Sequence, residues 1–232
     1  MVTAVGTHPL SAVIRDDLSR FSIQLHDMAR DRRELPPVSS IMVHRASGQR
    51  SVVSANAAVF AQLKAEFDPR WLAGVSIVEV DGQYMPLCIA AAKAARNRGI
   101  PVVLDSGSWK PGLSRLLPFV DTAICSSDFC PPGCRSEEEV FAFLAKRKIP
   151  RIAITRGGAA IRFVEEGKRG WIPVRKIGPV DTLGAGDIFH GAFCHYAAMG
   201  HTFRESLAAA SRAATFSCRY PGTRSWMAKV SS

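Results

Sequence analysis

The sequence lacks the features that assign a chain to a specialised class of protein. It has no run of about 18 apolar residues, and its first ten residues do not place a basic segment before an apolar one, so we expect neither a membrane span nor a secretory signal. Internal repeats and low-complexity tracts are absent too. Aromatic residues make up only 8% and charged residues 22%, against 47% hydrophobic, an ordinary globular composition. We expect a soluble, cytoplasmic protein with one domain over residues 1–232.

Cysteine is scarce, and its spacing argues against a structural metal. Six Cys occur, and no closely spaced pair is followed by a second Cys or His pair. Cys130 and Cys134 would supply two zinc ligands, but nothing nearby completes a tetrahedral set, so we disfavour a zinc site. Reduced thiols are the expected state.

Acidic residues are outnumbered, 20 Asp and Glu against 30 Lys and Arg, which gives a formal net charge of +10. This charge favours anionic ligands without choosing among nucleotide, nucleic acid and acidic lipid. The densest basic stretch, 146–148, ends a predicted helix, where cations complement the helix dipole. No nucleic-acid recognition motif accompanies the charge, so a nucleic-acid binder is the weakest hypothesis, and we expect no nucleic-acid or membrane partner.

From residue 75 onward, short β-branched runs alternate with stretches of helical periodicity, a pattern typical of an α/β fold with a mostly parallel sheet. The first 60 residues differ: they predict a helix near 11–21 and then a hairpin of poor apolar alternation, a small β flap around 36–56. The predicted strands of the sheet are 75–80, 101–104, 121–125, 151–155, 160–164 and 170–174, and its helices are 84–98, a helix capped by Ser136 and ending at 146–148, 185–199 and 203–218.

Polar residues follow four of the predicted strands, at the edge of a parallel sheet where ligands bind. They are Asp81-Gly82, Asp105-Ser106-Gly107, Ser126-Ser127-Asp128 and Thr155-Arg156-Gly157-Gly158. Each alone fits a turn or a helix cap. Four in succession favour a ligand site.

The segment Asp181-Thr182-Leu183-Gly184-Ala185-Gly186-Asp187 stands directly before an apolar helix. No Lys follows the glycines, so it is not a Walker loop. Gly184, Ala185 and Gly186 let a ligand approach the backbone, and the unpaired N–H groups of a helix start form an anion hole. Asp187 in the first turn puts a carboxylate beside that anion, which is costly unless the carboxylate accepts a proton; the alternative is that Asp187 only caps the helix. Phosphoryl transfer needs such an anion site and base.

The segment 181–187 resembles the C-terminal signature of the ribokinase-like (PfkB) carbohydrate kinases. Residues 152–158 are similar to the family's nucleotide-binding strand and turn, and 100–105 to its central strand. The resemblance runs from about residue 5 to 221 and, through the segments at 81–82 and 127–128, looks closest to the ketohexokinase and fructokinase-like branch. It implies a ribokinase-like α/β fold, with helices on both faces of the sheet and a small β flap.

The resemblance also assigns roles. It implies that Asp187 is the catalytic base and that Gly184 to Gly186 form the anion hole. Arg50 matches a flap arginine that reaches substrate or phosphate. The remaining implied roles are an ATP site at Thr155, Gly157, Gly158 and Ser127, and a monovalent-cation site, for K⁺, at Asp181 and Thr182 beside the loop 221–224. The implied cofactors are ATP and Mg²⁺.

The chain departs from the family pattern at three places. Ser127 to Cys130 replace an Asn-x-x-Glu segment near Mg²⁺, and Ala160 stands where a glycine is expected. The family's first strand and sugar-binding segment have no counterpart, so we expect either a piece of a longer protein, which we favour, or self-association as a homodimer that covers the exposed surface.

The leading hypothesis is an ATP-dependent kinase of a small monosaccharide, a ketose or furanose. Its main alternative is a kinase-fold protein that binds nucleotide but turns over weakly or not at all, because its sugar site is incomplete. A nucleoside or a hydroxymethylpyrimidine remains an alternative acceptor, since related enzymes share the signature.

Overall fold

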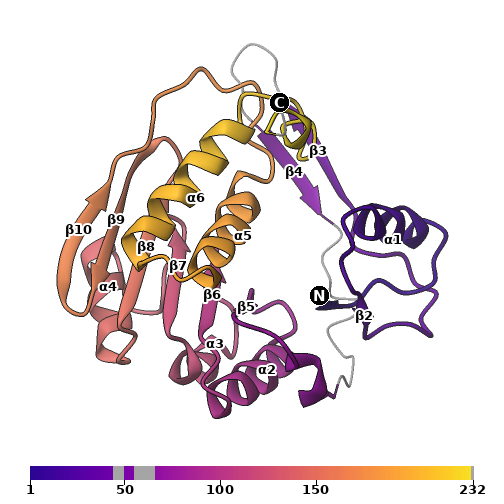
Figure 1. Ribbon diagram of the computed structural model, residues 1–232, viewed down its shortest axis with the longest axis horizontal. Coiled ribbons are helices and arrows are strands. Elements are labelled where there is room, and N and C mark those ends of the chain that lie inside the picture. The colour runs from indigo at the N-terminus through magenta and orange to yellow at the C-terminus, as the bar shows by residue number, and fades with distance from the viewer. Residues whose placement is uncertain (44–49, 55–65, 231–232) are drawn as a thin grey trace. The chain divides into compact units, whose positions relative to one another are not determined.

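The computed structural model describes residues 1–43, 50–54 and 66–230. It divides into two compact units, residues 1–66 and 67–232, which we describe separately (Figure 1). The smaller unit contains β1 (Val2–Thr3), α1 (Ser11–Arg20), β2 (His26–Asp27), β3 (Ser39–Val43) and β4 (Arg50–Ser54). The prediction of a single domain stays a prediction.

The smaller unit has two small sheets. Strands β1 and β2 pair in parallel. The carboxylate of Asp27, in β2, accepts the backbone N–H groups of Val5 and Ala29, both at 2.9 Å, and forms an ion pair with Arg15. Strands β3 and β4 form an antiparallel pair that joins neither other sheet, so the prediction of a separate hairpin is confirmed. Residues 44–49, the centre of that predicted hairpin, lie outside the described residues.

The larger unit is built on one six-stranded sheet with the strand order β10-β9-β8-β7-β6-β5. Neighbours from β5 to β8 are parallel, and β8, β9 and β10 are antiparallel. The strands are β5 (Val78–Val80), β6 (Val102–Ser106), β7 (Thr122–Ser126), β8 (Arg151–Arg156), β9 (Ala159–Glu165) and β10 (Lys168–Ile172); the helices are α2 (Met85–Asn97), α3 (Leu113–Leu116), α4 (Glu137–Lys146), α5 (Ala185–Ala198) and α6 (Phe203–Ser217), with 3-10 turns at Pro69–Leu72, Leu117–Phe119 and Met227–Lys229.

Helices cover both faces of this sheet (Figure 1). Alternate side chains of a strand point to opposite faces, so Leu104 and Ile152 pack in the core with α2, α3 and α4, whereas Val103 and Ala153 pack in the core with α5 and α6. All four are at most 2% exposed. Burial on both faces explains why these strands read as continuous apolar runs rather than as alternating ones.

Element boundaries differ from the prediction where turns intervene. β5 begins at Val78 rather than Val75, because Gly74 has a φ of +72° and the N–H of Val75 still bonds to the carbonyl of Leu72. β10 covers 168–172 rather than 170–174, since Glu166 and Gly167 both take positive φ and return the chain directly into pairing with β9. The four-residue α3 was not predicted, being too short to show a helical period. No helix in the described part of the chain is long and apolar enough to cross a membrane.

The predicted cap of α4 is present in full. Ser136 Oγ accepts the N–H of Glu139 at 3.3 Å, and the Glu139 carboxylate accepts the N–H of Ser136 at 3.0 Å. Replacing Ser136 by Ala removes one acceptor from the helix start, so we expect the free energy of unfolding to fall by about 1 kcal/mol. Guanidinium denaturation measures this, with Ser136→Thr, which keeps the hydroxyl, as the matched control. Equal stability of all three proteins would contradict the role of the cap.

Candidate active site

The start of α5 is shaped by one glycine. Gly184 precedes the helix with a φ of +72°, in the left-handed region that residues with a Cβ avoid. A Cβ at this position would also lie 2.8 Å from Cγ2 of Thr223 in the C-terminal loop. Gly184 is therefore required twice, by its backbone conformation and by the close approach of that loop.

Asp181 fastens the segment before the helix. One carboxylate oxygen accepts the N–H of Leu183 and the other accepts the N–H of Gly222, each at 2.9 Å. The carbonyl of Cys218 accepts the N–H groups of Val180 and Asp181. The signature segment and the C-terminal loop consequently form one hydrogen-bonded structure that fixes where α5 begins.

The residues after Gly184 leave room for a ligand. The N–H of Ala185 bonds to the carbonyl of Thr182 at 3.3 Å, and the helix ladder begins with the N–H of Ile188 to the carbonyl of Gly184 at 2.9 Å. Gly186 is exposed, and a Cβ there would meet no heavy atom of the described residues within 4 Å. The backbone of the first turn is thus open to an anion.

Asp187 is exposed on that first turn and faces a second carboxylate. Asp105, at the end of β6, has a raised pKa, first because it is partly buried and further because of the negative charge of Asp187. The nearby basic side chains of His190 and Lys110 oppose that rise in the pKa. The end of β6 and the start of α5 therefore share one electrostatic environment.

His190 links the helix to the sheet. Its side chain is buried, with Nδ1 at 2.8 Å from the carbonyl oxygen of Gly186, and Nε2 at 3.3 Å from that of Ile124 in β7 and 3.4 Å from Oδ1 of Asp105. One turn further along, the thiol of Cys194 donates to Oε2 of Glu79 in β5 at 3.5 Å. The polar face of α5 thus contacts three neighbouring strands, β5, β6 and β7.

The residues predicted to bind ATP lie at the ends of β7 and β8. The N–H of Ser127 donates to the carbonyl of Thr155 at 2.9 Å, and Thr155 Oγ1 donates to the carbonyl of Cys125 at 3.3 Å. Gly157 has a φ of +55° in the β8–β9 turn, and Gly157 and Gly158 are both exposed, with no heavy atom of the described residues within 4 Å of a Cβ at either position. The structure brings Ser127 and Thr155 together beside an open glycine turn.

The remaining predicted site residues are Arg50, Asp181 and Thr182. Arg50 begins β4 in the smaller unit, and its side chain lies outside the described part of the structure. Asp181 and Thr182 lie beside the C-terminal loop, but their role in binding a monovalent cation stays a prediction. Within the ranges that the structure describes, no group of three or more His, Cys, Asp or Glu side chains is arranged to hold a metal ion.

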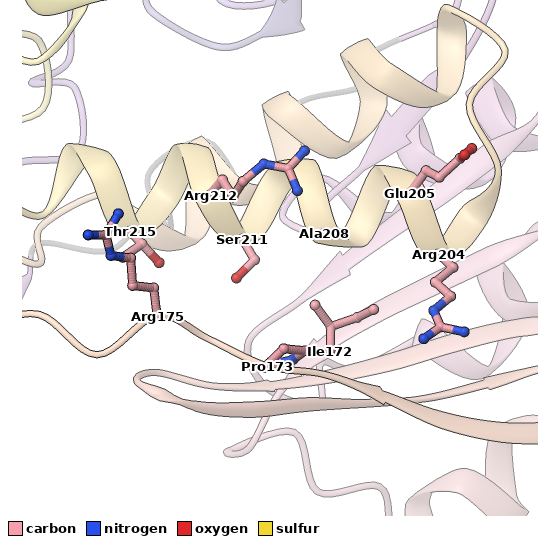
Figure 2. Close-up of a pocket in the computed structure, with 9 residues that line it drawn as sticks. All are labelled: Ile172, Pro173, Arg175, Arg204, Glu205, Ala208, Ser211, Arg212 and Thr215. Carbon is pink, nitrogen blue, oxygen red and sulfur yellow. The ribbon is translucent and has the colours of Figure 1, made fainter.

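A separate pocket lies between α6 and the segment that follows β10. Its volume is about 460 Å³. Figure 2 shows Ser211 pointing from α6 toward Ile172 and Pro173. Its other lining residues are Arg175, Arg204, Glu205, Ala208, Arg212 and Thr215. None of the predicted site residues whose side chains the structure describes lines it, so the pocket is distinct from the site at the start of α5.

Asp105 and His190 are the site residues that sequence reasoning did not single out. Asp105 was noted only as one of several polar strand ends. His190 carried a weak signal: a histidine four residues after Gly186 can bond back to the preceding turn, and it interrupts an otherwise apolar stretch, Ile188 to Cys194. Its contacts with β6 and β7 depend on the sheet and are invisible in the sequence.

The model of the family described as pfkB family carbohydrate kinase matches residues 1–229. Among solved structures, a protein from Agrobacterium tumefaciens provisionally assigned as a ribokinase is 27% identical, with a TM-score of 0.83 over 97% of this chain and 75% of that one. An E. coli protein provisionally assigned as ribokinase II, solved with ATP and Mg²⁺, is 16% identical, with a TM-score of 0.74 over 95% of this chain and 77% of that one.

An adenosine kinase from Anopheles gambiae, in complex with P1,P4-di(adenosine-5) tetraphosphate, is 18% identical, with a TM-score of 0.71 over 95% of this chain and 73% of that one. The two matches below 25% identity bear on the fold alone. Together these likenesses confirm the predicted ribokinase-like α/β fold.

The two reasons for glycine at position 184, its backbone conformation and the close approach of Thr223, can be tested by measuring the free energy of unfolding. Gly184→Ala should lower the free energy of unfolding by more than the 1–2 kcal/mol expected for left-handed backbone alone, because the new Cβ also meets Thr223. Chemical denaturation of the single mutant and of Gly184→Ala in a Thr223→Ser background should show partial recovery in the double mutant. Gly191→Ala, at an exposed helical position of α5 with open space, is the control and should be neutral or stabilising. Equal losses at both glycines would refute the steric argument.

Proposed function

The chain belongs to the pfkB family of carbohydrate kinases, and from that premise we propose that it transfers the γ-phosphoryl group of MgATP to a hydroxyl of a small monosaccharide, a ketose or a furanose. At the coarser level, family membership makes it a kinase of a carbohydrate or nucleoside acceptor. The proposal is supported chiefly by one observation: an exposed carboxylate, Asp187, lies on an open first helical turn whose position is fixed by Gly184 and Asp181.

In the proposed reaction the backbone of this turn and the side chain of Asp187 have different roles. The backbone N–H groups that follow Gly184 stabilise the negative charge of the phosphoryl group during transfer. The side chain of Asp187, three residues after Gly184, orients the acceptor hydroxyl and takes its proton. Because transfer of a phosphoryl group needs little covalent help from the protein, an anion hole and a positioned base supply most of what the chain must contribute.

We propose that the nucleotide lies against the ends of β7 and β8. Small residues at Gly157 and Gly158 admit phosphate or ribose close to the backbone, and Ser127 lies one hydrogen bond from Thr155. Mg²⁺ usually takes only one or two carboxylates and completes its shell with phosphate oxygens and water, and it neutralises phosphate charge when bound. Because Ser127 to Cys130 depart from the family pattern near Mg²⁺, we assign no protein ligand of the ion in this segment.

The identity of the acceptor is the more specific part of the proposal. The segments at 81–82 and 127–128 favour a ketose or furanose through their resemblance to the fructokinase-like branch. A nucleoside is the second candidate, since an adenosine kinase is among the structures similar in fold. A panel of ketoses, furanoses, aldohexoses and nucleosides, with ADP release as the readout, separates these acceptors. Turnover with none of them would favour the alternative, a nucleotide-binding protein without effective turnover.

Asp187 is tested by removing its charge. Asp187→Asn should lower kcat by about 10²–10⁴, the range expected for the loss of a general base, with little change in the affinity for ATP. Asp31→Asn, at an exposed surface position of the smaller unit, is the matched control and should retain wild-type kcat. Near-normal turnover of Asp187→Asn would mean that this carboxylate only caps its helix.

The anion hole is tested by filling it. Gly186→Val places two methyl groups over the open first turn, where we expect them to abolish binding of MgATP, as measured by isothermal titration calorimetry. The fold should survive, because the space around Gly186 is empty in the described structure and its backbone is helical. A folded Gly186→Val protein that binds MgATP as the wild type does would place the phosphates elsewhere.

A further inference from the structure

We propose that His190 is an imidazolium that positions the peptide between Gly186 and Asp187, the peptide that carries one N–H of the anion hole. The proposal deepens the proposed function and rests on it for the catalytic role of that peptide. It assigns His190 no contact with substrate: the residue acts through the backbone of the first turn of α5.

The contacts of the two ring nitrogens indicate which of them carries a hydrogen. Nδ1 of His190 faces the carbonyl oxygen of Gly186 at 2.8 Å, and Nε2 faces the carbonyl oxygen of Ile124 at 3.3 Å and Oδ1 of Asp105 at 3.4 Å. Carbonyl oxygens only accept hydrogen bonds, so each ring nitrogen must carry a hydrogen to make its contacts. A neutral ring has a single N–H and would leave one nitrogen lone pair facing an oxygen lone pair. With Asp105 ionised, only the charged ring satisfies both sides.

The charges around the ring support the same assignment. His190 is only 5% exposed, and a buried cation is stable only beside a compensating charge. Carboxylates face it from the two strands packed under α5, Asp105 on β6 and Glu79 on β5, and Asp187 lies one turn earlier on its own helix. The other charged or titratable groups of this cluster are Asp81, Lys110 and Cys194.

The pKa directions are consistent with that compensation. Burial raises the pKa of Asp105, and a positive ring at His190 would act against that rise. Partial loss of solvent likewise raises the pKa of Glu79, and His190 again opposes it. Four carboxylates surround two basic groups, His190 and Lys110, so protonation of the ring brings this region closer to neutrality.

A charged His190 also affects the N–H at the other end of the peptide group that it contacts. The Gly186 carbonyl belongs to the same planar peptide as the N–H of Asp187. A charged donor on the carbonyl fixes the orientation of that plane and polarises it, which strengthens the N–H at its other end as a donor to an anion. His190 therefore ties the phosphate-facing turn of α5 to β6 and β7 and increases its attraction for negative charge.

The protonation state has a direct spectroscopic test on the wild-type chain. Histidine labelled with ¹⁵N gives different nitrogen shifts and couplings for the imidazolium and for each neutral tautomer. We expect the imidazolium pattern for His190 at pH 7.5, assigned by its loss in His190→Asn and its retention in His195→Asn. His195 is the matched control because it lies on the same helix but is exposed. A neutral ring for His190 would overturn the inference.

The positioning role has a kinetic test. His190→Asn and His190→Gln should lower kcat by about 10–100-fold, as expected when a catalytic turn is misplaced by a fraction of an ångström, while the KM for the acceptor changes little. His195→Asn should keep the wild-type kcat. A charged ring with unchanged kcat in both His190 variants, confirmed as folded by thermal unfolding, would overturn the positioning role.

Failure of the proposed kinase activity and failure of the inference about His190 give different experimental results. A wild-type chain that phosphorylates no acceptor, with its His190 ring charged, would refute the proposed kinase activity and the catalytic role of His190 with it, but would leave the assignment of the imidazolium intact. A neutral His190 in a chain that phosphorylates sugars would refute only the inference about His190.

Discussion

Burial of the central strands on both faces is the constraint on which the larger unit depends. Leu104, Ile124 and Ile152 are fully buried, and their sequence neighbours Val103, Ala123 and Ala153 are at most 2% exposed on the opposite faces. A sheet of this kind needs helices on each side, and parallel strands need crossovers that return the chain to the same edge. The polar residues that end β6, β7 and β8 are thereby gathered along one edge, and Asp187 at the start of α5 interacts with Asp105 of β6 there.

The position of α5 follows from the same core. Phe189 and Phe193 pack with Val103, Ile124 and Ala153 on one face of the sheet, and this burial fixes the helix in both position and rotation. Residues one turn apart share a helix face, so His190 and Cys194 both reach the strand ends, while Asp187 stays exposed at the helix start. Apolar packing therefore determines which polar groups meet.

The polar cluster at this edge is costly to maintain. Burial raises the pKa of the Cys194 thiol well above its usual value, so Cys194 is a neutral donor to Glu79, whereas Asp105 and Asp187 repel each other. Active sites commonly keep such arrangements because the groups that destabilise the fold are those the reaction uses. The carboxylates are tolerated because His190 and Lys110 lie among them and because the backbone is anchored by Asp181.

The sequence by itself indicated the six strands, the four longer helices and the signature segment of the larger unit, because each is a local pattern: apolar runs, a helix cap at Ser136 and glycines at 184 and 186. It also indicated Asp187, whose place in a first helical turn is a matter of spacing. Only the tertiary structure decided that Gly184 must lie against Thr223, that Asp181 binds the N–H of Gly222, and that His190 lies between Gly186, Ile124 and Asp105. These contacts join residues up to 85 positions apart, as between Asp105 and His190, and no local periodicity encodes them. They arise because two helices and three strands must be buried against one another before their ends can meet.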